Sequence, residues 1–261
     1  ADRWTAAWGA DMVEAARIAL AEPPALDLVL ADPSQTAKWA EELEGASLAP
    51  GHIRLARGSA IEMLPGYADG AWWVQDLAAS LPARLLGQGH HSEIADLCAA
   101  PGGKTMQLAR QGWNVTALDK SAKRLERLQA NLERTGLAAK SNIGDVLTWE
   151  PEAPFDAVLL DAPCSATGTF RRHPDVLHRI GPKQVAELVE LQAAMLDKAA
   201  AMVKPGGTLV YATCSLEPEE GEHQAEAFLA RHDNFSKAAI DTALLPEGIT
   251  PTDGYVRTLP G

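Results

Sequence analysis

The sequence predicts an α/β fold in which a mostly parallel sheet, covered by helices on both faces, follows a small α+β module. Two observations predict this fold. From residue 71 onward, apolar runs of strand length alternate with segments of helical spacing. A Gly-rich turn at 101–103 directly follows one apolar run, as in doubly wound sheets. We therefore divide the chain into a lead-in module, residues 1–70, and a second domain, residues 71–261.

Composition and charge exclude several classes of protein. The 261 residues are 46% hydrophobic and 22% charged, which is typical of a globular chain. No apolar stretch reaches the roughly 18 residues that span a membrane, and the first residues do not resemble a secretory signal. Three cysteines argue against a disulfide scaffold and for a reducing cytosol. The net charge of −12 argues against binding nucleic acid through overall charge, which leaves local basic patches for that role.

The lead-in module combines helices and short strands. Trp4–Leu20 has the spacing of a helix with Trp8 and Met12 on one stripe, and Pro23-Pro24 ends it. The remaining elements, in chain order, are a strand at Leu26–Leu30, a helix from Pro33 to Leu43 and a strand at Ile53–Leu55. No residue here has obvious chemistry, so we expect the module to pack against the second domain or to position RNA.

The second domain alternates strands and helices. In chain order we expect a helix at Gln75–Leu86, a strand at Glu93–Leu97, a helix at Lys104–Arg110, a strand at Asn114–Leu118, a helix capped by Ser121, strands at Ser141–Val146 and Asp156–Leu160, a helix at Pro182–Val203 and a strand at Thr208–Thr213. Ligands of such sheets bind beyond the carboxyl ends of the strands. The residues that follow each strand are therefore the candidates for function.

The first candidate is the segment DLCAAPGGKT, residues 96–105. A strand that runs into Gly102-Gly103 and then into a helix lets backbone N–H groups approach a ligand closely. A P-loop would need Gly at the position of Cys98, and a dinucleotide fingerprint would need more than the adjacent glycine pair. ATP and NAD are therefore disfavoured. Asp119, at the end of the next strand, can accept hydrogen bonds from a ribose diol or act as an acid at a helix N-terminus.

Two cysteines follow two further strands, in the segments Asp161-Ala-Pro-Cys-Ser165 and Tyr211-Ala-Thr-Cys-Ser215. A single Cys is usually a small buried hydrophobic residue. Two of them at the ends of adjacent strands, each followed by Ser, indicate reactive thiols instead. The chain has no C-x-x-C pattern and its histidines are distant in sequence, so we predict no metal site.

Three segments together, DLCAAPGGKT, DAPCSATGTFRRHP and KPGGTLVYATCS, resemble the S-adenosylmethionine-dependent RNA (cytosine-5)-methyltransferases. Within them the chain is most similar to the bacterial sun type, which acts on small-subunit ribosomal RNA; the eukaryotic relatives include the nucleolar proliferation-antigen proteins. The resemblance covers roughly residues 25–261. It implies a Rossmann-like methyltransferase sheet and a cytoplasmic enzyme of rRNA processing that produces 5-methylcytosine.

The same resemblance implies additional segments in the relatives. They usually carry a helical RNA-binding domain before this region and a final Asp-Gly-Phe-Phe strand after it. Because neither lies within residues 1–261, we expect this chain to bind isolated RNA weakly and with strong salt dependence.

The resemblance also implies a role for each reactive side chain. It assigns the attacking thiolate to Cys214 and the partner of cytosine N3 to Asp161. Cys164 is then placed to act as a base or relay when the enzyme is expelled. Lys104 lowers the pKa of a thiol or holds the base.

S-adenosylmethionine is the implied cofactor, and it should lie along the first three strand ends. We expect its methionine part over 100–103, its ribose on Asp119 and its adenine near Asp145. The full predicted cofactor set is Cys98, Ala99, Ala100, Pro101, Gly102, Gly103, Lys104, Asp119, Asp145 and Asp161. RNA is the implied partner, and we expect Arg171 and Arg172 to contact its phosphates. This basic strip extends over Arg54, Arg57, Lys120, Lys123 and Arg124.

Two other functions compete with this interpretation. One is a DNA cytosine or small-molecule methyltransferase that uses Cys164 as its nucleophile, which would leave Cys214 without a role. The other is a non-catalytic module that binds the cofactor or RNA and assists assembly. The intact set of Cys164, Cys214 and Asp161 counts against that alternative.

Overall fold

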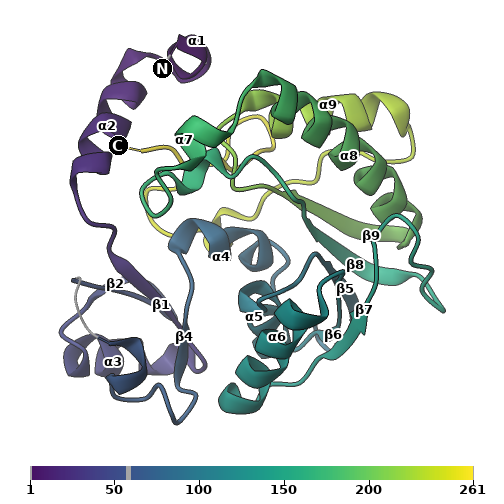
Figure 1. Cartoon of the computed structure of the whole chain (residues 1–261). Coiled ribbons are helices and arrows are strands. Elements are labelled where there is room, and N and C mark those ends of the chain that lie inside the picture. Colours follow the sequence, from purple (N-terminus) through teal and green to yellow (C-terminus); the bar gives the residue numbers. More distant parts are fainter. Residues whose placement is uncertain (1, 57–59, 261) are drawn as a thin grey trace.

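Two sheets organise the protein in the computed structural model, which describes residues 2–56 and 60–260 (Figure 1). The larger sheet has the order β7-β6-β5-β8-β9, and every neighbouring pair is parallel. Its strands are β5 (Glu93–Leu97), β6 (Asn114–Asp119), β7 (Lys140–Ile143), β8 (Phe155–Asp161) and β9 (Val203–Ala212). Because the order reverses direction between β5 and β8, the carboxyl ends of these two strands flank the expected ligand crevice.

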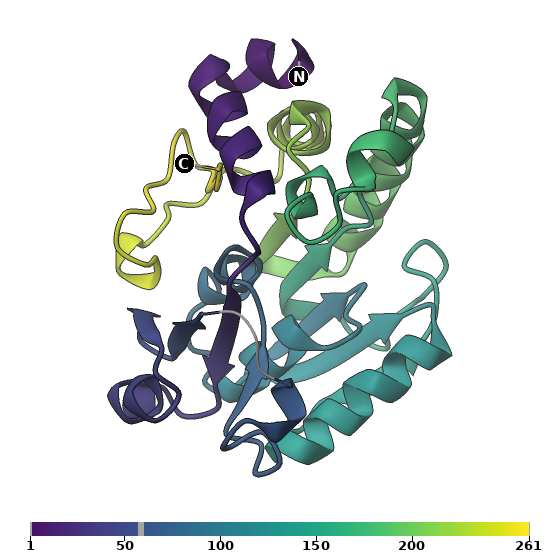
Figure 2. The same ribbon diagram turned by 60° about the vertical axis from the view of Figure 1, so that its left-hand side comes forward.

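Helices cover both faces of this sheet, which confirms the predicted fold class (Figure 2). The helices α4 (Leu77–Arg84), α5 (Gly103–Arg110) and α6 (Ala122–Thr135) pack on one face. The other face is covered by α8 (Pro182–Ala201) and α9 (Glu222–Arg231). A short helix, α7 (Val176–Arg179), precedes α8.

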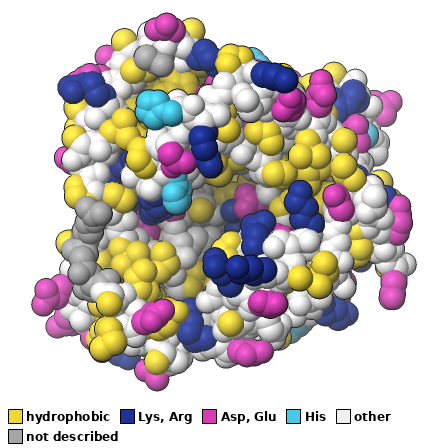
Figure 3. Space-filling model, in the orientation of Figure 1, with side chains coloured by type: hydrophobic (Ala, Val, Ile, Leu, Met, Phe, Trp, Pro, Cys, Tyr) yellow, Lys and Arg dark blue, Asp and Glu magenta, His cyan; other side chains and the backbone are white. Residues whose placement is uncertain are grey.

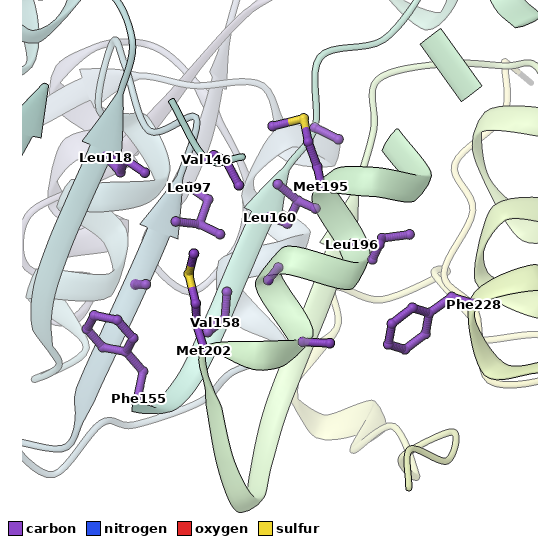
Figure 4. Packing of buried hydrophobic residues seen from close by; sticks show 14 residues of the cluster. Leu97, Leu118, Val146, Phe155, Val158, Leu160, Met195, Leu196, Met202 and Phe228 are labelled. Atoms are coloured by element: carbon purple, nitrogen blue, oxygen red, sulfur yellow. The ribbon is translucent and has the colours of Figure 1, made fainter. Parts of the chain in front are cut away.

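Side chains of β8 show how a strand buried on both faces supplies two cores. Ala157 and Leu159 pack with residues of α4 and α5 on one face. Val158 and Leu160 point to the opposite face, where they meet Met195 of α8 (Figure 4). Because neighbouring side chains of a strand alternate between faces, such a strand is apolar throughout. This explains why the run DAVLL was recognisable as a central strand.

The smaller sheet is antiparallel, in the order β2-β3-β1-β4. Its strands are β1 (Leu26–Leu30), β2 (Ala46–Ala49), β3 (His52–Leu55) and β4 (Trp72–Val74). One face packs on α3 (Thr36–Glu42) through Trp39, and the other places Val29 and Trp73 against α6. Strand β4 follows residue 70, so this sheet extends past the division of the chain that the sequence suggests; that division itself stays a prediction.

The N-terminal segment forms two helices where the sequence predicts one. The helices α1 (Asp2–Trp8) and α2 (Ala10–Ala21) meet at Gly9, whose φ of 86° breaks the helix. The predicted apolar stripe nevertheless packs, because Met12 is buried in one cluster with Phe170 and Leu216. Figures 1 and 2 both show α2 beside the C-terminal segment.

Several element boundaries differ from the predicted ones. Strand β7 ends at Ile143, three residues early, because the Asp145 carboxylate accepts a hydrogen bond from Leu147 N and starts a turn. Strand β9 begins at Val203, and the strands β2 and β4 and the helix α9 were not predicted. The 3₁₀ turns lie at Pro33–Gln35, Ile61–Met63, Thr167–Thr169, Pro218–Glu220 and Thr242–Leu244. No helix in the described part of the chain has the length and apolar character needed to cross a membrane.

Candidate active site

Backbone hydrogen bonds hold the carboxyl ends of β5, β6 and β7 together. Ala99 N donates to Leu118 O over 3.0 Å, and Gly144 N donates to Asp119 O over 3.1 Å. Gly102, with φ at 105°, is the N-cap of α5. A Cβ on Gly102 would lie 2.9 Å from Leu128 Cγ, so the turn packs against α6 only where a side chain is missing. Gly102 is itself buried, and the partly exposed Gly103 begins α5, whose N-terminus can face a polar ligand.

Asp119 lies where the sequence places it, at the end of β6, but it is already engaged. It is buried, with 2% of its surface exposed. Its carboxylate accepts from Ala100 N at 3.2 Å and from Ser121 N at 2.9 Å. Arg124 pairs with the same carboxylate at 3.1 Å and also donates to Ala100 O. A ribose diol would therefore reach Asp119 only after the guanidinium group of Arg124 has moved.

Two further members of the predicted cofactor set, Asp145 and Cys98, differ in their exposure to solvent. Asp145 is exposed just beyond the end of β7, near the carboxyl end of β6. Cys98 is half-buried, and burial, followed by the charges of Asp119 and Asp161, raises the pKa of its thiol to about 12. Cys98 is therefore a neutral thiol and a poor nucleophile at neutral pH.

Lys104 and Asp161 form an ion pair across the crevice, with 2.7 Å between Nζ and Oδ2. Lys104 comes from the first turn of α5 and Asp161 from the end of β8. Burial opposes the charged form of Lys104, but Asp161 outweighs this effect and raises the pKa of the ammonium group. Lys104 therefore stays protonated at the sheet edge, where its charge is paired with Asp161.

Asp96 lies inside the sheet below this pair and is fully buried. Thr105 donates a hydrogen bond of 2.6 Å to its Oδ2, whereas Oδ1 has no hydrogen-bond partner among the described residues. Burial raises the pKa of this carboxyl to about 7. The sequence placed Asp96 in the motif but gave it no role, because its burial depends on both neighbouring strands.

The two predicted thiols are in contact. Cys164 follows β8 and Cys214 follows β9, and their sulfur atoms are 3.4 Å apart. A hydrogen bond from Cys164 lowers the pKa of Cys214 and outweighs burial, which raises it; the charge of Asp161 also raises this pKa, and the charge of Lys104 lowers it. The same contact, together with burial, raises the pKa of Cys164. Cys214 is also the exposed member of the pair, so its geometry and its electrostatics favour it as the thiolate.

A buried carboxylate that the sequence reasoning missed connects the two thiol loops. Glu220 is fully buried and accepts hydrogen bonds from Ser165 and Ser215, the residues that follow the two cysteines. The sequence did show the two Cys-Ser pairs. It did not show which of the acidic residues in 217–222 turns inward.

The predicted RNA-contact residues lie on the loop after Cys164. Phe170 anchors this loop in the core, while Arg171 and Arg172 are exposed. Arg172 pairs with Asp76 at 2.9 Å, and both arginines line a cavity of about 70 Å³ together with Arg54. Lys and Arg side chains gather beside a hollow on the face shown in Figure 3.

The rest of the predicted basic strip is mixed. Arg54 is paired with Asp27 at 2.6 Å and Arg124 with Asp119, whereas Lys120 and Lys123 are exposed. Arg57 lies outside the described residues. Within residues 2–56 and 60–260, no group of three or more His, Cys, Asp or Glu residues could hold a metal ion.

The site thus combines a thiol with a lowered pKa, a second thiol, a Lys–Asp ion pair and a glycine turn at the N-terminus of a helix. Such a set can add a sulfur nucleophile to an electrophilic ring while an ion pair holds the polar edge of that ring. The structure brings Cys214, Cys164, Asp161 and Lys104 together at one sheet edge. Asp119 and Asp145 lie at the neighbouring strand ends.

Comparisons with known proteins agree with this description. The family described as 16S rRNA methyltransferase RsmB/F matches residues 83–261. Ribosomal RNA small subunit methyltransferase B of Salmonella arizonae is 43% identical over 217 residues, which cover 81% of this chain and 49% of that protein. The chain therefore spans about half the length of the curated relatives that it matches.

Solved structures share the fold. A methyltransferase homolog protein from Pyrococcus horikoshii is 28% identical, with a TM-score of 0.75 over 94% of this chain and 84% of that one. NSun6 from Pyrococcus horikoshii, solved with SFG, is 19% identical, with a TM-score of 0.80 over 88% of this chain and 86% of that one. These similarities confirm the Rossmann-like methyltransferase sheet that the sequence predicts.

Proposed function

The chain belongs to the RsmB/F family of 16S rRNA methyltransferases, and on that premise we propose that it methylates C5 of a cytosine in small-subunit ribosomal RNA. S-adenosylmethionine would be the methyl donor, and the cytoplasm the compartment. The observation that carries the proposal is the contact of the two thiols, 3.4 Å apart, at the sheet edge that also holds Lys104 and Asp161.

The residues at the first three strand ends fit S-adenosylmethionine. We place the methionine part at the glycine turn 102–103, which leads into the N-terminus of α5; Gly102 packs against Leu128 of α6, and Gly103 is partly exposed. Asp119 offers carboxylate oxygens for the ribose hydroxyls once Arg124 moves, and Asp145 lies beyond the next strand for the adenine. The bound cofactor would supply an electrophilic methyl group.

Cys214 is the proposed nucleophile. C5 of cytosine attacks an electrophile only weakly, so the Cys214 thiolate first adds to C6 and makes the ring electron-rich at C5. The hydrogen bond from Cys164 and the charge of Lys104 both favour the thiolate of Cys214. A base inside folded RNA must be flipped out or unpaired to reach this exposed sulfur.

Asp161 is the proposed partner of the polar edge of cytosine, N3 and the exocyclic amine. Addition of the thiolate at C6 puts negative charge on N3, so Asp161 would assist as an acid that delivers a proton to N3 while its other oxygen accepts a hydrogen bond from the exocyclic amine. Lys104 fixes the Asp161 carboxylate by donating to it over 2.7 Å, and it keeps a positive charge beside the ring.

Cys164 is proposed to act in the elimination step. After transfer, the methyl group is bonded to C5, the C5 proton must leave, and the bond between Cys214 sulfur and C6 must break. When Cys214 is bonded to C6, its sulfur no longer needs the hydrogen bond from Cys164. The Cys164 thiol can then accept the C5 proton while its own proton passes to the Cys214 sulfur, 3.4 Å away, as the bond between that sulfur and C6 breaks.

One experiment tests the function and the nucleophile together. The chain is incubated with small-subunit ribosomal RNA or precursor subunits and S-adenosylmethionine, and the nucleosides are analysed by mass spectrometry for 5-methylcytidine. RNA containing 5-fluorocytosine should trap a covalent adduct on the peptide that carries Cys214. An adduct on Cys164 would support the DNA-type alternative. Cofactor binding without methylation of any RNA form would support the non-catalytic one.

A further inference from the structure

Glu220 stands out because a carboxylate is buried where its partners are neutral. It lies in the 3₁₀ turn Pro218–Glu220 and has no exposed surface. In the described part of the chain, no Lys or Arg forms an ion pair with it. Buried carboxylates of this kind are costly unless hydrogen bonds satisfy them.

Four hydrogen bonds satisfy Glu220, and all of them come from the two thiol loops or the helix beside them. Oε1 accepts from Ser165 N and from Gln192 Nε2, each at 2.9 Å. Oε2 accepts from the hydroxyl of Ser215 at 2.5 Å and from the hydroxyl of Ser165. The two serine oxygens are 3.0 Å from each other.

Ordinary sheet pairing ends just before the two thiols. The strands β8 and β9 are in register up to Asp161 and Ala212, and Ala162 N still donates to Ala212 O over 3.0 Å. Beyond that point, one backbone hydrogen bond, from Gly168 N to Cys214 O over 2.9 Å, still joins the two loops, and side chains provide the other links. Thr167 accepts from Leu216 N at 2.9 Å, and Glu220 binds the residue after each cysteine.

Gln192 of α8 supports the same arrangement from behind. Its Nε2 donates to Glu220 Oε1 and also to Pro163 O, each at 2.9 Å, so the residue before Cys164 is held as well. Cys164 is therefore fixed on both sides by groups that converge on one carboxylate.

We propose that Glu220 is a positioning residue that keeps Cys164 and Cys214 in contact by binding the serine that follows each of them. Its role in catalysis rests on the function proposed above, whereas its role in the thiol geometry does not. Glu220 is not assigned a catalytic role, because its hydrogen bonds go to the serines and to Gln192 rather than to either sulfur.

Disulfide formation measures the thiol contact without any substrate. Diamide oxidises two neighbouring thiols to a disulfide, takes up their two electrons and two protons, and becomes the hydrazine. The rate at which the 164–214 disulfide forms, followed by peptide mass spectrometry, reports how often the two sulfurs meet. We expect Glu220→Ala to slow this rate about tenfold, because four buried donors lose their acceptor. Glu220→Gln, which keeps one acceptor oxygen, should recover part of the rate.

Two controls separate a local effect from general loosening. Glu219→Ala removes a carboxylate of the same turn, one that binds Arg3 and not the thiol loops. This variant should form the 164–214 disulfide at the wild-type rate. Alkylation of Cys98, which lies in a different loop, should be unchanged in every variant. A folded Glu220→Ala protein that forms the disulfide at the wild-type rate would overturn the proposal.

A second variant decides the matter if Glu220→Ala does not fold. The double substitution S165A/S215A removes both hydroxyl donors and leaves the carboxylate in place. We expect it to slow the crosslink severalfold, and a wild-type rate would overturn the proposal. In methylation assays, Glu220→Ala should lower kcat with little change in KM for S-adenosylmethionine. If no variant methylates RNA while the crosslink rates differ as expected, the proposed function fails and the positioning role stands.

Discussion

The turn after β5 and the two loops after β8 and β9 lie at the same sheet edge, yet different forces hold them. We call residues 98–103, Asp119 and Asp145 the cofactor half, and Asp161, Cys164 and Cys214 the thiol half. In the cofactor half, backbone hydrogen bonds, the Asp119 carboxylate on Ala100 N and the missing side chain at Gly102 fix the turn. In the thiol half, one backbone hydrogen bond, from Gly168 N to Cys214 O, is supported by a buried network of side-chain hydrogen bonds centred on Glu220.

This difference predicts a division of labour. A turn defined by its backbone presents N–H groups and carbonyls, which suit binding. Loops held by a buried polar network can fix two sulfur atoms 3.4 Å apart, which suits chemistry. Substitutions in the cofactor half should therefore change affinity for S-adenosylmethionine, and substitutions in the thiol half should change turnover.

The two cysteines give the largest expected effect. Cys214→Ala should lower methylation about 10³-fold or more, because burial raises the pKa of the other two thiols, Cys98 and Cys164, and keeps them neutral. Cys164→Ala should still add and methylate, but it should release product slowly and accumulate a protein–RNA complex that survives denaturation. Denaturing gels of both variants with RNA and cofactor measure this.

The same variants test the division itself. Both should bind S-adenosylmethionine as the wild type does in calorimetric titration, because neither sulfur belongs to the cofactor half. A trapped complex from Cys214→Ala, with none from Cys164→Ala, would exchange the two roles.

Asp119→Ala should change affinity for S-adenosylmethionine and leave the contact of the two thiols unchanged, which is the opposite of what we expect for the cysteine variants. Loss of the carboxylate removes the proposed acceptor of the ribose diol, and hydrogen bonds to charged groups are worth about 1.5–3 kcal/mol. We expect affinity for S-adenosylmethionine to fall about tenfold to a hundredfold, with disulfide formation between Cys164 and Cys214 unchanged. Calorimetric titration that gives the wild-type affinity would remove Asp119 from the cofactor half.

Asp96 lies between the two halves and should link stability to pH. The folded protein holds its proton up to a pKa of about 7, compared with an ordinary value of 3.8. Between these values the folded state binds more protons than the unfolded state, so Asp96 lowers stability as pH rises through this window. Asn does not titrate, so the Tm of Asp96→Asn minus that of the wild type should increase by several degrees as pH rises from 5 to 8. Melting curves that stay parallel across this range would contradict the assignment.

The loop that carries Arg171 and Arg172 should give the smallest effect. Reversing both to Glu should weaken RNA binding and reduce the dependence of log K on log salt by about one to two, because one or two phosphate contacts are lost. Cofactor affinity should not change, since the cavity that these side chains line contains no residue of the cofactor half. Filter binding at several salt concentrations checks this, and equal slopes would show that the loop is only solvated.

Much of the parallel sheet could be predicted from sequence because its signals are local. The run DAVLL is apolar because β8 is buried on both faces, and Gly102 follows β5 because the turn has no room for a side chain. The family resemblance is confirmed by the comparisons, and the strand pattern alone places Cys164 and Cys214 at the ends of adjacent strands, as the pairing of β8 with β9 confirms. The roles given to those residues stay predictions.

The parts that were not predicted depend on contacts between distant segments. Strand β4 is short and is defined by its pairing with β1, about 45 residues earlier. Glu220 is one of several acids in a polar stretch, and only its burial against Ser165 distinguishes it. Helix α1 ends at Trp8 because of the φ of Gly9, which the apolar stripe alone does not show.

Helix α1 is bonded to Leu216 and Glu217, which follow Cys214, and these contacts affect how the protein folds. Arg3 and Trp4 bind Glu217, and Trp8 donates to Leu216 O, across separations of 208 to 214 residues. Contacts so distant in sequence close slowly, because much loop entropy is lost before they form. During synthesis α1 emerges before the parallel sheet and must wait for nearly all of it before residues 216–217 exist. Refolding followed by circular dichroism should therefore recover helix content before Cys214 regains its native reactivity toward thiol reagents.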